Sequence, residues 1–149
     1  MKQQREPASF EALKAASFIR GESTLSVVCE RPFEEVALQL EGCIAANALG
    51  IVHVHDFGRL LRTTGMALDL QCRVYEVCNP RLAAQLIALD PGLAHVLPCR
   101  ISMHNQGGVT TVTTPMPSAV MTEFSHAADV ARLARTFEAG LQPVLRGLR

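Results

Sequence analysis

Residues 72–103, CRVYEVCNPRLAAQLIALDPGLAHVLPCRISM, decide the fold that we expect for this chain. Alternation of apolar and polar residues over 70–78 predicts a β-strand. Asn79 and Pro80 follow directly and are typical of a helix start, because Asn caps helices and Pro is tolerated at the first helical position. An Asp-Pro-Gly sequence then ends the helix, and renewed alternation predicts a second strand over 98–104.

Two cysteines mark the ends of these strands. Cys78 ends the first strand and Cys99 begins the second, on either side of the short helix. If the strands are neighbours, the two sulfur atoms lie within reach of a disulfide or a shared soft metal ion. The helix expected to start at Asn79-Pro80 follows Cys78 directly, and a helix N-terminus lowers the pKa of a thiol and so favours the reactive thiolate. The alternative is that both are small buried side chains, since Cys99 shares a strand face with Ile101 and Met103.

The rest of the chain alternates between helical and strand patterns, which predicts one α+β domain. Helical spacing is clearest between Pro32, which can open a helix, and Gly50, which can end it. We expect residues 1–21 to form an N-terminal helical extension and residues 22–149 to form the domain. The other expected elements are a helix over 9–20, strands over 23–29, 51–57 and 109–114, the last at a sheet edge, and a C-terminal helix capped by Ser125.

Composition excludes several classes of protein. The 149 residues are 48% hydrophobic and 19% charged, which is typical of a globular chain. Lys and Arg number 14 and so do Asp and Glu, so the basic surplus of a nucleic-acid-binding protein is missing. No apolar run approaches the ~20 residues that a membrane span needs, and the first residues do not resemble a signal peptide. We therefore expect a cytoplasmic protein whose five cysteines are reduced.

The Cys78-Asn79-Pro80 and Leu97-Pro98-Cys99 sequences, followed by a Gly107-Gly108 turn, resemble the bacterial domain-of-unknown-function family 302. The resemblance covers roughly residues 22–122. It implies a β-α-β-β-β-β-α core, in which helices pack on one antiparallel sheet as in TATA-box-binding-protein-like folds, with an extra N-terminal helix. It also implies a homodimer. The family has no established activity, so the resemblance implies a fold and no mechanism.

Other candidate site residues lie on the neighbouring strands. His53 and His55 occupy alternate positions of the 51–57 strand, so we expect them on one face with Ile51 and Phe57, where they could bind a metal ion. Glu76 shares a strand face with Cys78. It could pair with Arg73 or Arg100, or it could be a functional carboxylate with a raised pKa, and both alternatives are open.

The chain carries no motif of a hydrolase, nucleotide-binding protein or zinc protease, so a binding protein is expected in preference to an enzyme. We expect a binding or sensing module with a small-molecule pocket near Cys78, Asn79, Cys99 and Glu76. The alternative is a thiol-redox protein, or one that holds a soft metal ion or haem through Cys78 and Cys99, although no cofactor is the default expectation. An enzyme that uses His53, His55 and Glu76 as acid and base is the weakest hypothesis.

Overall fold

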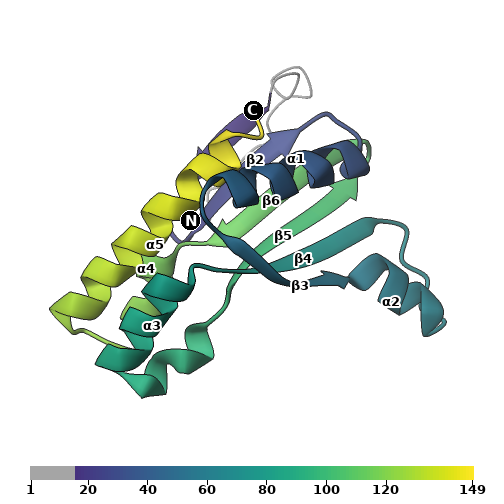
Figure 1. The fold of residues 1–149 in the computed structure, drawn as a ribbon. Helices are drawn as coiled ribbons and strands as arrows, with labels where there is room; N and C mark the ends of the chain where they lie inside the picture. Colours follow the sequence, from purple (N-terminus) through teal and green to yellow (C-terminus); the bar gives the residue numbers. More distant parts are fainter. Residues whose placement is uncertain (1–15) are drawn as a thin grey trace, which may run out of the picture.

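Antiparallel strands in the order β1-β2-β6-β5-β4-β3 form the central sheet of the computed structural model, which describes residues 16–149 (Figure 1). The chain follows a simple path in which the strands are interrupted by short helices. The elements are β1 (Ser17–Arg20), β2 (Thr24–Cys29), α1 (Phe33–Ala46), β3 (Gly50–Asp56), α2 (Phe57–Thr63), β4 (Gln71–Cys78), α3 (Pro80–Leu89), the 3-10 helix η2 (Pro91–Val96), β5 (Cys99–Gln106), β6 (Val109–Pro115), α4 (Pro117–Thr122) and α5 (Ala128–Arg146).

The predicted α+β fold is confirmed. The elements β2, α1, β3, β4, β5, β6 and α5 follow one another in the expected β-α-β-β-β-β-α order. Every pair of neighbouring strands is antiparallel, as expected for one antiparallel sheet. The strands over 70–78 and 98–104 correspond to β4 and β5, which lie side by side with Val77 opposite Cys99.

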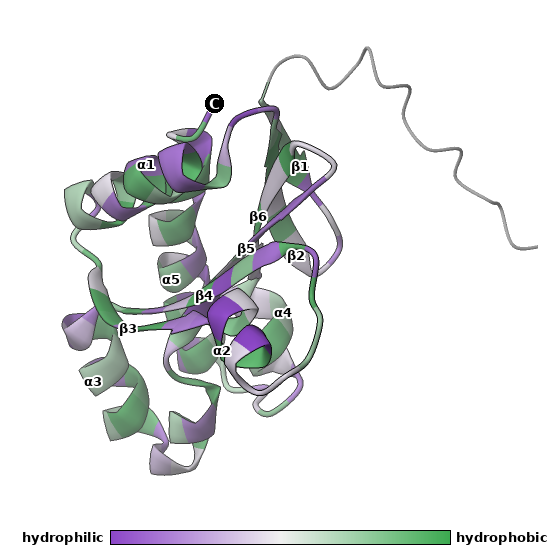
Figure 2. Cartoon of the chain, turned by 90° about the vertical axis from the view of Figure 1, so that its right-hand side faces the viewer, coloured by the Kyte–Doolittle hydropathy of each residue, from purple (hydrophilic) through white to green (hydrophobic). Residues whose placement is uncertain are grey.

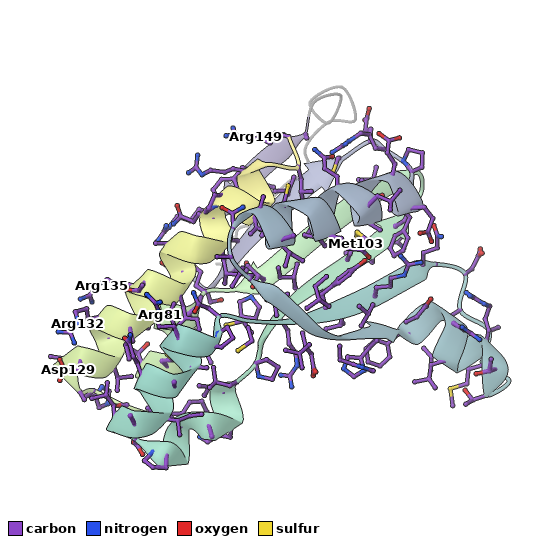
Figure 3. The ribbon with its side chains drawn as sticks, in the orientation of Figure 1. Arg81, Met103, Asp129, Arg132, Arg135 and Arg149 are labelled. Carbon is purple, nitrogen blue, oxygen red and sulfur yellow. The ribbon has the colours of Figure 1, made fainter. Side chains whose placement is uncertain are left out.

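The main core lies between one face of the sheet and the helices α1 and α5, which pack on the same side (Figures 1 and 2). Strand alternation directs Tyr75 and Val77 of β4 and Ile101 and Met103 of β5 to this face, and all four are fully buried. Met103 lies beneath α1 in Figure 3. The alternate residues of these strands face away from the core, where Val74, Glu76 and Ser102 are half-buried and Arg100 is exposed.

A second, smaller hydrophobic cluster lies where α3, η2, α4 and the first half of α5 meet. It contains Leu86, Leu93, Met121, Val130 and Phe137, all with little or no exposure. Cys99 packs against both this cluster and the main core, so it occupies the junction between them.

Three expectations about single helices and strands are wrong. The helix predicted over 9–20 is contradicted where it can be tested, because Ser17–Arg20 form β1 and pair with β2, while 9–15 lie outside the described residues. The strand β6 is not at an edge, since it lies between β2 and β5. Ser125 does not cap the C-terminal helix, because α5 begins at Ala128 and its N-cap position is Ala127.

His53 and His55 share one face of β3, as expected, but the expectation that Ile51 lies on that face is wrong. The pairing of β3 with β4 shifts between Ile51, which lies opposite Val77, and His53, which lies opposite Glu76. This β-bulge inserts Val52 and reverses the alternation. Ile51 is therefore opposite a residue of the buried face, while the two histidines are on the face of Glu76.

No helix within residues 16–149 combines the length and apolar character that crossing a membrane requires.

Candidate functional site

The predicted site residues at the end of β4 lie close together. Asn79 caps α3 as expected, because its Oδ1 accepts hydrogen bonds from the backbone N–H groups of Arg81 and Leu82 at 3.1 and 3.3 Å. Cys78 follows Val77, which pairs with Cys99, so the two cysteines are diagonal neighbours on adjacent strands. Alternation places them on opposite faces of the sheet, with Cys99 on the helical side.

Cys99 is the more enclosed of the two thiols. Burial raises its pKa to about 11, and the nearby Cys78 adds to the effect because a charge on one sulfur disfavours a charge on the other. Cys99 is therefore a protonated thiol at neutral pH, because burial and the neighbouring Cys78 both disfavour the thiolate form that catalytic cysteines use.

A pocket of about 270 Å³ opens beside Cys99. It lies between the start of β5, the end of η2 and the short helix α4. Most of its wall is apolar, and the polar groups are His95, Arg100 and the Cys99 thiol. The His95 ring meets the Phe124 ring edge-on, with 4.5 Å between the ring centroids. The apolar part of the wall includes Pro98, Pro115, Pro117, Val120 and Met121.

A second pocket, of about 160 Å³, is also lined by Cys99. It contains the predicted site residue Asn79 together with Val77, Leu82 and Phe137. Cys99 thus contributes to two hollows, one bounded by α4 and the other by α3 and α5. Cys78 and Glu76 line neither of them.

Glu76 belongs to a polar cluster on the sheet face that points away from the main core. Its Oε1 lies 3.3 Å from His55 Nε2 and 3.8 Å from Arg100 Nε. His55 and His53 touch, with ring centroids 4.5 Å apart. Arg100 was one of the two arginines expected to pair with Glu76.

The other arginine, Arg73, pairs with Glu34 at 2.6 Å and with Asp56 at 3.8 Å, and it fixes the start of α1 to the strands.

Histidine and cysteine ligands do not converge on one point in the described part of the chain. No group of three or more His, Cys, Asp or Glu side chains in residues 16–149 could hold a metal ion. His53 and His55 still offer two adjacent imidazoles, with ring centroids 4.5 Å apart.

Sequence reasoning missed most residues of the larger of the two pockets that Cys99 lines. His95, Phe124 and Met121 carry no motif, and the helix α4 was not expected. Pro117 begins α4, and a proline at the first position of a helix is the signal that could have predicted it. Arg100 could have been found, because it follows Cys99 on the same strand.

Comparisons with known proteins agree with this fold. The model of a family described as "Domain of unknown function DUF302" matches residues 25–148. The crystal structure of an uncharacterized conserved DUF302 protein from Bacillus stearothermophilus superposes with a TM-score of 0.81 at 20% sequence identity, covering 87% of this chain and 100% of that chain. A search of curated proteins found no match. The family match extends beyond 22–122 and includes α5.

Proposed function

The chain belongs to the DUF302 family of unknown function, and we propose that within this fold it acts as a small-molecule binding or sensing module. The observation that carries the proposal is the pocket of about 270 Å³ beside Cys99. Ligand sites are concave and mostly apolar, with a few polar groups that fix orientation. An apolar wall with His95, Arg100 and a thiol on it meets that description.

The composition of the pocket supports binding more than catalysis. Cys99 is a protonated thiol. His55 and Glu76, which could act as acid and base, do not line the pocket, and of their cluster only Arg100 does. A catalytic site needs a nucleophile or base within hydrogen-bond reach of the substrate.

Binding can be tested with toluene, a neutral apolar probe of small size. We expect saturable NMR shifts of backbone amides in His95–Arg100 and in Pro117–Phe124. Val120 lines the pocket, so Val120→Phe fills part of it and weakens binding by about tenfold or more. Val52→Phe is the control: it makes the same substitution at a residue of β3 that is 61% exposed, and it should leave the binding of toluene unchanged. Shifts that persist in Val120→Phe would count against the pocket.

A second candidate function is thiol or soft-metal chemistry at Cys78 and Cys99. The observation that favours it is the pairing of Val77 with Cys99, which makes Cys78 and Cys99 diagonal neighbours on adjacent strands. His53 and His55 were the further metal ligands expected, but they do not form a group of three or more ligands with the cysteines within residues 16–149. This function requires a thiolate at neutral pH, and the raised pKa of Cys99 is an argument against Cys99 as that thiolate.

Homodimerisation also stays a proposal, and the outer edge of β3 supports it. β3 is the last strand of the sheet, and Ile51, Val52 and Val54 on it are 39%, 61% and 38% exposed. An apolar edge strand with unpaired backbone groups invites pairing with another strand. A second copy of the chain fits, since two identical edges can pair antiparallel about a two-fold axis.

A cytoplasmic location remains a prediction.

A further inference from the structure

We infer that the pocket beside Cys99 takes a small apolar molecule that carries one carboxylate, bound by Arg100 with His95 assisting at the polar side. This inference rests on the proposed function and specifies the class of ligand.

The charge of the pocket lining is the first support. Among the residues that line it, Arg100 is the only one with a permanent charge, and the lining contains no carboxylate. A cation beside an apolar wall favours an anion over a neutral or cationic molecule of the same shape, because only the anion gains a charge-assisted interaction with the guanidinium.

The side chain of Arg100 is available for such an anion. Its closest approach to a carboxylate is 3.8 Å, between its Nε and Glu76 Oε1, which is longer than a hydrogen bond. Within residues 16–149 the hydrogen bonds of the structure include none from the Arg100 guanidinium. The two terminal nitrogens can therefore form the bidentate pair that arginine makes with carboxylates.

Glu76 does not satisfy Arg100 fully, because it also interacts with His55. The His55 Nε2 atom is nearer to the same Glu76 oxygen, at 3.3 Å. Arg100 is also 59% exposed at its side chain, which leaves room for a ligand to approach it.

His95 supplies a second polar group on the pocket wall. Its ring meets the Phe124 ring edge-on, with 4.5 Å between the ring centroids, so a nitrogen-bearing ring and an apolar ring are in contact. An imidazole N–H can donate to a carboxylate oxygen. The small volume, about 270 Å³, suits a ligand with a single ring or a short alkyl chain.

Three probes that share a ring and differ in their polar group test the inference: phenylacetate, 2-phenylethanol and phenethylamine. Calorimetry gives each affinity, and NMR shifts of the pocket amides locate the binding. We expect phenylacetate to bind about tenfold more tightly than 2-phenylethanol, and phenethylamine to bind most weakly.

Variants assign the preference to a residue. Arg100→Gln should remove the advantage of phenylacetate over 2-phenylethanol while 2-phenylethanol still binds, and Arg100→Lys should retain part of the advantage. Arg81, an exposed arginine of α3 that does not line the pocket, provides the control, because Arg81→Gln should leave all three affinities unchanged (Figure 3).

The outcomes separate the two proposals. If 2-phenylethanol or phenethylamine binds in the pocket as tightly as phenylacetate, or if Arg100→Gln keeps the preference, the ligand class is wrong and the binding function stands. If none of the three shifts the pocket amides, and toluene does not either, the binding function itself is overturned.

Discussion

Cys99 shows how one residue can belong to the core and to a binding site. It packs against both hydrophobic clusters and lines both pockets around it. Its thiol is the most perturbed titratable group among the described residues, since burial raises its pKa to about 11. A buried, neutral thiol acts as a small apolar side chain that a ligand can touch.

Alkylation of Cys99 by iodoacetamide tests this protonation state. A pKa of about 11 leaves about one thiol in a thousand ionised at pH 8, so the reaction should be slow and its rate should rise about tenfold per pH unit up to pH 10. The thiolate is the reactive form, so raising the pH towards the pKa must accelerate the reaction. Mass spectrometry of the Cys99 peptide gives the rate.

The matched control is the chain unfolded in urea, where the thiol returns to its ordinary pKa near 9.0 and reacts faster. Fast alkylation of folded Cys99 at pH 7, with no pH dependence, would contradict its burial as a neutral thiol. It would then favour the thiol function at Cys78 and Cys99.

The end of α1 shows how a helix stop is built without the expected glycine. Gly50 was predicted to end this helix, but α1 ends at Ala46 and Gly50 begins β3. The turn residue is Ala48, with a φ of 58°, and the N–H of Leu49 donates to the Ile44 carbonyl at 3.3 Å. This is the hydrogen bond of a Schellman motif, in which the left-handed position is usually Gly.

Ala48→Gly should therefore stabilise the protein. Alanine in the left-handed region is strained by its Cβ, so we expect a gain of up to about 1 kcal/mol in the free energy of unfolding. Urea denaturation followed by circular dichroism measures it. Ala45→Gly, an exposed residue in the last turn of α1, should instead cost about 0.5–1 kcal/mol. An equal loss in both variants would show that the strain at Ala48 is negligible.

At the scale of the whole molecule, the open question is what covers the β3 edge. The opposite edge strand, β1, has four residues, whereas β3 has seven and exposes Ile51, Val52 and Val54. A bulge and a charged edge are the usual protections against unwanted pairing. β3 has the bulge at Val52 but carries apolar side chains instead of charges around it.

Sedimentation velocity over a series of protein concentrations tests the proposed dimer. The wild-type chain should sediment as a dimer, and Val52→Lys should sediment as a monomer, because a lysine on the edge repels its symmetry mate. Leu38→Lys is the matched control, since Leu38 is 72% exposed on α1, away from the edge, and should leave the dimer intact. A monomeric wild-type chain, or a dimer lost only in Leu38→Lys, would disprove the edge as the interface.

Much of the fold could be predicted because its signals are local. The alternation in 70–78 and 98–104, the Asn79-Pro80 helix start and the helical pattern after Pro32 each depend on a few neighbouring residues, and the structure has these elements where they were expected. The short first strand was missed because its helical pattern is overridden by pairing with β2, a contact that becomes visible only in the folded chain.

The candidate site was predictable only in part. The sequence by itself determined the α+β class and the order of the main elements, since periodicity and the ends of strands are properties of short segments. That Cys78 and Cys99 lie on neighbouring strands followed only from the pairing of β4 with β5. Tertiary structure alone decided the position of β6 inside the sheet, the bulge that turns His53 and His55 towards Glu76, and the pocket that η2, β5 and α4 form around Cys99. The physical reason is that these features depend on pairing and packing between residues distant in the chain, which no local pattern encodes.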